Sequence, residues 1–321
     1  MIKILAYRFS AFGDVAMTVP VITEFLQQNP EVELVMVSRQ NFKDLFEGIP
    51  KLTFIGIDLD DYKGILGLRK LGKRLLKEFS PTYIADLHDV IRTKTLNLFF
   101  TKNGLQVFKI NKGKKEKELL TDVWNLDKKK LLPTSERYAE VFRAMNFKLE
   151  LSHQYLPKSV TKTGIGIAPF AQHKGKMLPL EKMLEVVRIV AKTHKIYFFG
   201  GGKHEVAILN DWQEKVPNTT NLAGTLSLKE ELQKISALEV MISMDSANMH
   251  LASLVGTRCI SIWGSTHPYA GFLGYGQLEK DTVQVNDLTC RPCSVFGDKE
   301  CFRGDWACLE EIDIQEIINL I

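Results

Sequence analysis

Residues Leu238 to Pro268 read LEVMISMDSANMHLASLVGTRCISIWGSTHP, and this segment is the clearest indication of the fold. It opens with an apolar run at residues 240–242, which is typical of a buried strand. From Met249 onward, apolar residues recur at helical spacing as far as Gly256, where a C-terminal cap is expected. A second apolar run, residues 259–263, follows at once. Strand, loop, helix and strand in this order predict a parallel crossover unit.

Polar residues follow the first of these strands, at the end where α/β proteins bind their ligands. Asp245, Ser246 and Ala247 stand where the helix is expected to begin, so backbone amides and the helix dipole there favour a phosphate. His250 lies inside the helix and can add a donor, while Asp245 can accept hydrogen bonds from sugar hydroxyls. On spacing alone, a simple helix cap and a packed histidine explain the same pattern equally well.

Upstream of this stretch, two further strand-to-helix junctions belong to the same predicted sheet. Lys176 follows an apolar run at residues 164–168 and can neutralise a diphosphate, although a solvent-facing loop lysine is the plain alternative. Gly201, the middle one of three consecutive glycines, follows another run at residues 196–199, and Glu205 begins the next helix. Consecutive glycines allow the backbone to approach a ligand closely.

The N-terminal half shows a second series of the same kind, with strands predicted at residues 2–7, 32–37, 52–57 and 83–87. Gly13 and Asp14 lie in the loop after the first strand, and a regular helix is expected from about Thr18 to Gln28. This loop has no GxGxxG pattern, which argues against a dinucleotide site. Asp14 is therefore either a capping residue or a catalytic base. Arg92, beyond the fourth strand, either binds an anionic group or pairs with Asp89.

Two successive strand–helix series predict an α/β protein with two domains, residues 1–157 and 158–321, joined by a linker near residues 151–163. Each domain is expected to contain a parallel sheet with polar residues at the carboxyl ends of its strands. Two such domains facing each other would form an interdomain cleft, which is a common ligand site.

Composition excludes several classes of protein. The chain has 321 residues, of which 45% are hydrophobic and 25% charged, and its formal net charge is +4. This balance describes a globular protein and is too mild to indicate nucleic acid. No apolar stretch has transmembrane length and the first residues read as a strand, so a cytoplasmic protein is expected, with peripheral membrane contact left open. Eight lysines crowd residues 108–130, as a solvated face or as a binding surface for an acidic acceptor or an anionic membrane.

Four of the five cysteines fall in one segment near the C-terminus: Cys290, Cys293, Cys301 and Cys308. In a cytoplasmic chain, this grouping favours a structural zinc site with four thiolate ligands over disulfides. The spacing is irregular for common zinc modules, so cysteines that pack or pair oxidatively remain the alternative.

Taken together, these motifs resemble those of the ADP-heptose:lipopolysaccharide heptosyltransferases, a bacterial family of GT-B glycosyltransferases. The similarity covers nearly the whole chain. It is carried by Gly13-Asp14 with Thr18 and Pro20, by Lys176, by the glycine turn with Glu205, by the Asp245–Ala252 stretch and by Trp263-Gly264-Ser265-Thr266-His267-Pro268. Two departures stand out: Ala247 occupies a usual glycine position, and Met177-Leu178 replaces a frequent Arg-Trp pair.

The resemblance implies a GT-B fold of two Rossmann-like domains and an inverting transfer of heptose, or a related sugar, from a nucleotide sugar such as ADP-heptose. It implies Asp14 as base and Lys176 as the residue that stabilises the leaving diphosphate. Gly13, Gly201, Glu205, Asp245, Ser246, Ala247 and His250 would bind the donor, and Arg92 the acceptor. No cofactor is expected for catalysis. The acceptor would be a lipopolysaccharide core or another surface glycan, met at the inner face of the inner membrane. A nucleotide-sugar epimerase and a non-catalytic sugar-nucleotide binding protein are the alternatives.

Overall fold

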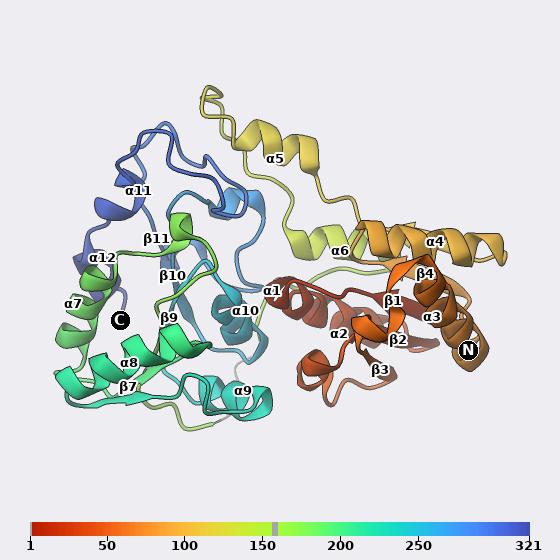
Figure 1. The fold of residues 1–321 in the computed structure, drawn as a ribbon, viewed down its shortest axis with the longest axis horizontal. Coiled ribbons are helices and arrows are strands. Elements are labelled where there is room, and N and C mark those ends of the chain that lie inside the picture. Colours follow the sequence, from red (N-terminus) through yellow and green to blue (C-terminus); the bar gives the residue numbers. More distant parts are fainter. Residues whose placement is uncertain (1, 156–159) are drawn as a thin grey trace. The chain divides into compact units, whose positions relative to one another are not determined.

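The computed structural model describes residues 2–155 and 160–321, and these form two compact units (Figure 1). The N-terminal unit contains Met1–Lys112 and Thr134–Ser152, and the C-terminal unit contains Gly113–Pro133 and His153–Ile321. The chain therefore makes an excursion, residues 113–133, into the second unit before it completes the first. The predicted boundary between residues 157 and 158 lies outside the described residues.

The N-terminal unit is built on a five-stranded parallel sheet of order β3-β2-β1-β4-β5. Its strands are β1 (Ile2–Tyr7), β2 (Val32–Arg39), β3 (Leu52–Ile57), β4 (Tyr83–Asp86) and β5 (Gln106–Lys109). The central strand β1 pairs in register with β2 and with β4, and Tyr7 lies opposite both Val37 and Asp86. Consecutive residues of β1, from Ile4 to Tyr7, are all buried. Both faces of the sheet are therefore covered at this strand, as expected when helices lie on both sides.

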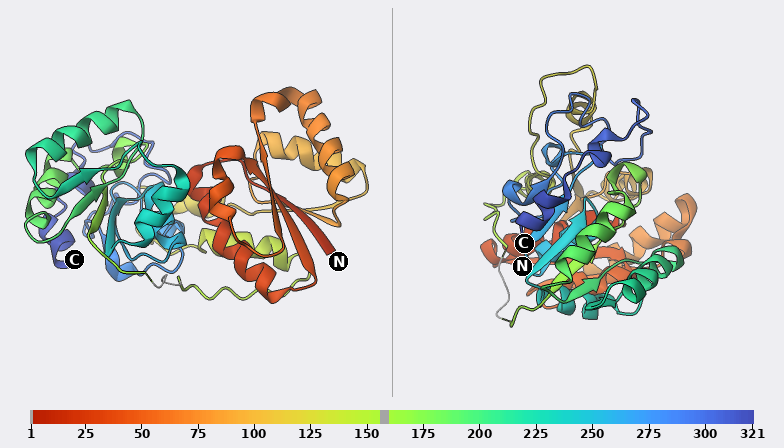
Figure 2. Two further views of the ribbon diagram at one scale, coloured as in Figure 1. Left: turned by 90° about the horizontal axis from the view of Figure 1, so that it is seen from below. Right: turned by 90° about the vertical axis from the view of Figure 1, so that its left-hand side faces the viewer.

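Helices cover both faces of this sheet (Figure 2). Its helices are α1 (Phe12–Ala16), α2 (Thr18–Gln28), α3 (Gly64–Phe79), α4 (Ile91–Lys102) and α6 (Thr134–Arg143), with 3₁₀ turns η1 (Gln40–Phe46) and η2 (Leu59–Tyr62). Helices α2 and α6 pack together through stacked Phe25 and Phe142 rings, 4.3 Å between centroids. Leu71 of α3 and Phe100 of α4 bury against Leu5 and Tyr7 of β1.

The C-terminal unit holds a six-stranded parallel sheet of order β11-β10-β9-β6-β7-β8. Its strands are β6 (Ile165–Ala168), β7 (Ile196–Phe198), β8 (Thr219–Asn221), β9 (Val240–Met244), β10 (Cys259–Ile262) and β11 (Thr282–Val283). The crossover unit predicted at residues 238–268 is confirmed, because β9, helix α10 (Ala247–Leu254) and β10 follow one another and the two strands pair in parallel.

The C-terminal unit contains further helices besides α10. They are α5 (Lys114–Leu120), α7 (Leu180–Val190), α8 (Lys203–Lys215), α9 (Leu228–Ser236), α11 (Ala307–Glu310) and α12 (Ile314–Asn319), with 3₁₀ turns η3 (Lys174–Lys176), η4 (Pro268–Ala270) and η5 (Glu279–Asp281). Met183 of α7 and Ile317 of α12 join Ile167, Ile242 and Ile262 of the sheet in one buried core. Helix α10 packs with α9 and against β9 and β10.

In each sheet the order of the chain reverses between two neighbouring strands. The reversal falls between β1 and β4 in the N-terminal unit and between β6 and β9 in the C-terminal unit. Crossover connections leave in opposite directions at such a point, so a crevice opens beyond the carboxyl ends of the two strands. In each unit, the loops that follow these two neighbouring strands are therefore positioned to form a ligand site.

Sequence periodicity did not reveal strands β5 and β11 or helices α4, α5, α11 and α12, and it misplaced the start of one helix. Strand β5 has only two central apolar residues and β11 is two residues long, so neither shows a readable alternation. Helix α5 lies within the lysine-rich run. Gly13 and Asp14 lie within helix α1 and not in a loop, because a helical turn already forms before the expected start at Thr18. Across the described ranges, no helix is both long and apolar enough to cross a membrane.

Candidate functional site

Asp14 lies beyond the carboxyl end of β1, in the first turn of α1. Its Oδ2 accepts a hydrogen bond from the Ala11 backbone N–H at 3.3 Å, so the capping role allowed by the sequence is present. The same oxygen forms an ion pair with Arg8 Nη2 at 2.6 Å. The Asp14 side chain keeps 26% of its surface exposed, whereas that of Arg8 keeps 6%. The Asp14 carboxylate is thus held by a buried arginine while it remains accessible to a substrate.

Arg8, the residue directly after β1, is held on several sides. Its Nη1 donates a hydrogen bond to the Leu87 carbonyl, after β4, at 2.6 Å. The guanidinium carbon lies 5.5 Å from the centre of the Tyr138 ring, and the Tyr138 hydroxyl donates to the Asp14 carbonyl at 3.2 Å. Although burial opposes its charge, the neighbouring Tyr138 and Asp14 raise the pKa of Arg8, so the guanidinium stays protonated.

His88 completes this cluster from the loop after β4. Burial, together with the positive charges of Arg8 and Lys112, lowers its pKa to about 3, so the ring is neutral at physiological pH. The Phe9 N–H donates to Nδ1 at 3.4 Å, which places the proton on Nε2, 3.4 Å from Ser10 Oγ. Because the His88 ring is neutral, Arg8 is the residue of this cluster that presents a positive charge to Asp14.

The loop that carries His88 is fixed by the buried Asp86 carboxylate at the end of β4. Asp86 Oδ1 accepts hydrogen bonds from the backbone N–H groups of His88 at 2.9 Å and Asp89 at 2.8 Å. Its Oδ2 accepts from Asn97 Nδ2 at 2.7 Å. A charge with partners on both oxygens is tolerable in the interior, and here it shapes the loop. Asp86 therefore has a structural role beneath the site.

Arg92, the predicted acceptor residue, lies in the first turn of α4 and is exposed. The ion pair of Asp89 is formed with Lys94, at 3.9 Å, so the alternative pairing of Asp89 with Arg92 is not the one observed. The positive charge of Arg92 also contributes to the lowered pKa of His88, which places Arg92 on the same side of the unit as the Asp14 cluster. An acceptor role for Arg92 stays a prediction.

The C-terminal unit has a corresponding ion pair at its own switch point. Lys176, after β6, places Nζ 2.9 Å from Asp245 Oδ2, after β9, and the two side chains keep 17% and 4% of their surface exposed. Thr266, after β10, donates its hydroxyl to the same Asp245 oxygen at 2.8 Å. Three loops from adjacent strands thus meet at one buried carboxylate. Asp245 orients Lys176 and does not cap α10.

Ser246 occupies the N-cap position of α10, and its side chain makes no capping hydrogen bond. Its hydroxyl instead lies 3.2 Å from Ser243 Oγ. Ala247 is the first residue of the helix, and His250 is buried one turn further on. Backbone N–H groups at the start of this eight-residue helix therefore lie beside the Lys176–Asp245 pair, which is an arrangement suited to an anionic ligand.

Gly201 and Glu205 lie together at the carboxyl end of β7, next to β6. The Gly201 N–H donates to Glu205 Oε2 at 2.7 Å, and Glu205 lies in the first turn of α8. Gly201 is exposed, with no other atom within 4 Å of the space where a Cβ would lie. The glycine turn therefore presents open backbone on the side of the sheet where Lys176 lies.

The four clustered cysteines line one small cavity of about 10 Å³, together with Ser265, Arg291 and Trp306. All are free thiols, and burial raises the pKa of Cys293 and takes that of Cys308 to about 12. Thiolates are soft ligands suited to zinc. Among residues 2–155 and 160–321, however, no three His, Cys, Asp or Glu side chains converge into a group that could hold a metal ion. Four thiols are a suitable set of ligands for a metal ion, but their positions in this structure do not form a metal site.

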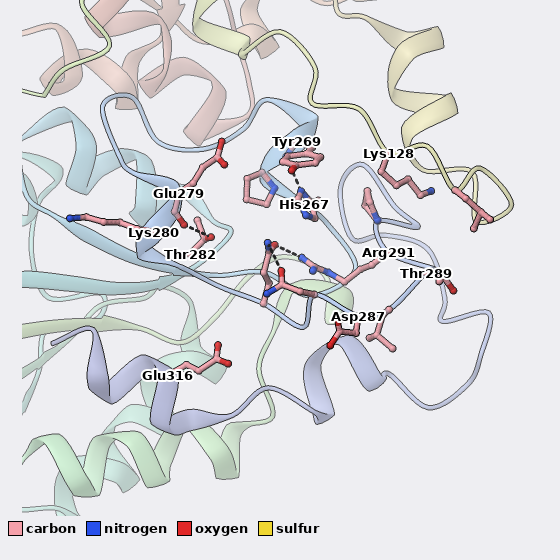
Figure 3. Close-up of a pocket in the computed structure, with 16 residues that line it drawn as sticks. Lys128, His267, Tyr269, Glu279, Lys280, Thr282, Asp287, Thr289, Arg291 and Glu316 are labelled. Atoms are coloured by element: carbon pink, nitrogen blue, oxygen red, sulfur yellow. Dashed lines mark hydrogen bonds between the residues drawn. The ribbon is translucent and has the colours of Figure 1, made fainter.

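A separate cavity of about 730 Å³ opens along the outer edge of the C-terminal sheet, beside β11 (Figure 3). His267, Tyr269, Arg291, Glu279 and Glu316 are among the side chains that line it. Burial and the Arg291 charge lower the pKa of His267 to about 4. None of the predicted donor-binding residues lines this cavity, so it is distinct from the Lys176–Asp245 pair.

The structure thus gathers the predicted residues into two clusters, one in each unit. Gly13, Asp14 and Arg92 belong to the first, and the Lys176, Gly201 and Asp245 loops to the second. Sequence reasoning missed Arg8 as the partner of Asp14 and Thr266 as a partner of Asp245. A charged residue directly after a buried strand was the available signal for Arg8, and the conspicuous Gly-Ser-Thr-His-Pro run was the signal for Thr266.

Comparison with known proteins gives a consistent picture. The sequence profile of glycosyltransferase family 9 (heptosyltransferase) matches residues 108–301. Lipooligosaccharide heptosyltransferase 2 of Campylobacter jejuni is 24% identical over 331 residues, covering 99% of this chain and 96% of that protein.

Solved structures agree with the fold. A family 9 glycosyltransferase from Veillonella parvula superposes with a TM-score of 0.74 at 15% identity, over 99% of this chain and 95% of that one. The ADP-heptose lipopolysaccharide heptosyltransferase II of E. coli gives 0.67 at 19% identity, over 89% and 91%. The predicted α/β class with two parallel-sheet units of GT-B type is confirmed.

Proposed function

This chain belongs to glycosyltransferase family 9, the heptosyltransferases, and we propose that it transfers heptose from ADP-heptose to a lipopolysaccharide core or related glycan acceptor. Family membership makes the chain a glycosyltransferase. The donor and the acceptor are the finer part of the proposal. They are supported by the C. jejuni relative, which is a lipooligosaccharide heptosyltransferase, and by the E. coli structure, which is an ADP-heptose enzyme.

In the proposed reaction, the acceptor hydroxyl oxygen attacks the anomeric carbon of the donor as the bond from that carbon to the diphosphate oxygen breaks. Asp14 accepts the hydroxyl proton, and ADP leaves with the electron pair of the broken bond. A single displacement of this kind inverts the anomeric configuration. Asp14 suits the role because its carboxylate is paired with a protonated Arg8, which favours the charged form, and because it remains partly exposed.

The C-terminal unit supplies the groups for the leaving diphosphate. Lys176 brings a positive charge, and the N–H groups at the start of α10, around Ser246 and Ala247, add hydrogen-bond donors. Asp245 holds the lysine in place and, with His250 and the turn at Gly201 and Glu205, would contact the rest of the donor. Gly13 of the N-terminal unit would contact the donor through its backbone.

The observation that carries the proposal is the Asp14 carboxylate, held by Arg8 at a switch point. We expect Asp14→Asn to leave ADP binding within about twofold of the wild type and to lower turnover about a hundredfold to ten-thousandfold, because a positioned base is lost. Isothermal titration with ADP and a coupled assay of ADP release measure the two effects. Full activity in Asp14→Asn would remove Asp14 as the base.

Family membership favours neither alternative function. A nucleotide-sugar epimerase would convert the donor without any acceptor, and a binding protein would bind it without forming product. Release of ADP that depends on added acceptor separates transfer from both.

We place the enzyme in the cytoplasm, at the inner face of the inner membrane, where a lipid-linked acceptor would be presented. Exposed apolar side chains concentrate on the excursion and the cysteine segment of the C-terminal unit: Leu119, Trp124, Leu126, Phe296 and Phe302. The Trp124 and Phe302 rings are 6.4 Å apart, so the two segments share one surface. Exposed Lys114 and Lys115 lie on α5 beside it. Amphipathic aromatic rings with flanking lysines are typical of a membrane–water interface.

A further inference from the structure

The cysteine segment is packed against the loop that carries Lys176. Ser265 joins the two: its carbonyl accepts the N–H groups of Cys293 at 3.1 Å and Ser294 at 3.2 Å, while its own N–H and hydroxyl donate to the Gly175 carbonyl at 2.8 and 2.9 Å. The approach is close enough that a Cβ on Gly175 would lie 2.8 Å from the Gly297 carbonyl oxygen. The segment therefore forms one wall of the loop.

Gly297 makes the decisive contact, because it lies directly against the aliphatic stem of Lys176. A Cβ at this position would come within 2.3 Å of Lys176 Cγ and 2.8 Å of Cδ. The turn around Gly297 is itself held, since the buried Ser294 hydroxyl accepts its N–H at 2.8 Å and donates to Asp298 Oδ1 at 2.8 Å. Because Gly297 has no side chain, the aliphatic part of Lys176 can pass beside it and bring Nζ to Asp245.

From these contacts, we propose that the cysteine segment is a positioning element for Lys176, with Gly297 as the residue that seats the lysine stem. The inference rests on the proposed role of Lys176 at the donor diphosphate. A lysine side chain loses much rotational freedom when it binds a ligand, so a stem that is already confined binds more tightly than a mobile one. The four cysteines, which share their cavity with Ser265 and Trp306, would then support donor binding without touching the donor.

Gly297→Ala tests the proposal, and the chain offers a matched control. Gly297 and Gly304 both have positive φ, +75° and +80°, so alanine meets the same backbone strain at either position. Only at Gly297 does the new methyl group meet Lys176, because no atom lies within 4 Å at Gly304. Thermal unfolding of both variants shows that each still folds.

We expect Gly297→Ala to weaken ADP binding about tenfold to a hundredfold, as when a hydrogen bond to a charged group is lost, with adenosine affinity nearly unchanged. Gly304→Ala should bind both as the wild type does. In a Lys176→Ala background the Cγ is absent, so Gly297→Ala should cause no further loss. ADP affinity near that of the wild type in Gly297→Ala, or equal losses for ADP and adenosine, would overturn the inference.

The reference variant Lys176→Ala separates this inference from the proposed function. If Lys176→Ala binds ADP as tightly as the wild type, the lysine does not contact the diphosphate, and the proposed function loses that residue. If Lys176→Ala weakens ADP binding while Gly297→Ala does not, the lysine keeps its role and the positioning inference is wrong.

Discussion

At the scale of single residues, the N-terminal cluster depends on Arg8. Its guanidinium contacts Asp14, the Leu87 carbonyl and the Tyr138 ring at once, which a lysine cannot reproduce because it lacks the planar fork. The other groups of the cluster do not compete for Asp14: His88 is neutral, and burial raises the pKa of Tyr138 so that it too is neutral. Arg8 thus both aims the carboxylate and favours its ionised form.

We expect Arg8→Gln to lower turnover by about tenfold to a hundredfold, the cost of a misplaced catalytic group, with ADP affinity unchanged. A cation beside a carboxylate favours its ionised form, so its removal lets the carboxylate hold a proton to higher pH. The acid limb of the pH–rate profile should therefore move to higher pH in Arg8→Gln and stay in place in Arg8→Lys. An unshifted limb in Arg8→Gln would contradict an electrostatic role for Arg8.

At the scale of elements, most of the cysteine segment lies between β11 and α11, where the chain forms no helix or strand. We expect it to hold a structural zinc ion through Cys290, Cys293, Cys301 and Cys308, which already line one cavity. Binding would require the thiols to lose their protons and turn toward a common centre, and it would stabilise this segment first.

Elemental analysis of protein purified without added metal tests the zinc. We expect about one zinc per chain, with thiols that resist alkylation until a chelator is added. Less than about 0.2 zinc per chain, with four freely titratable thiols, would leave reduced cysteines on a packed loop. The positioning of Lys176 does not depend on this result, because Gly297 and Ser265 make their contacts with the thiols free.

At the scale of the whole molecule, the question is where the enzyme meets its acceptor. Its net charge is +4. We expect it to sediment with vesicles containing phosphatidylglycerol more than with neutral phosphatidylcholine vesicles, and less so at high salt. Trp124→Ser with Phe302→Ser should reduce this binding several-fold.

Ile91→Ser is the control for the vesicle experiment. Ile91 is 85% exposed and belongs to the N-terminal unit, whereas Trp124 and Phe302 belong to the C-terminal unit, so its loss should leave vesicle binding unchanged. Equal loss in the control and in the Trp124/Phe302 variant would show that any exposed apolar residue matters and would remove this surface as the membrane contact.

Local sequence patterns were enough to predict the α/β class, the crossover unit at residues 238–268 and the strand-end position of most predicted site residues, including Asp14, Lys176, Gly201 and Asp245. Those inferences need only local information, because hydrophobic periodicity and turn residues are read within a few positions. Short strands such as β5 and β11 escaped detection for the same reason, since two apolar residues carry no period.

Which strand-end residues contact one another depends on the folded arrangement of the strands. Lys176 contacts Asp245 because β6 lies beside β9, and Arg8 is anchored to Leu87 because β1 lies beside β4. The excursion of residues 113–133 and the seat of Lys176 against Gly297 are likewise contacts between distant segments. The order of strands in a sheet arises from the packing of the whole unit, so no local pattern records it.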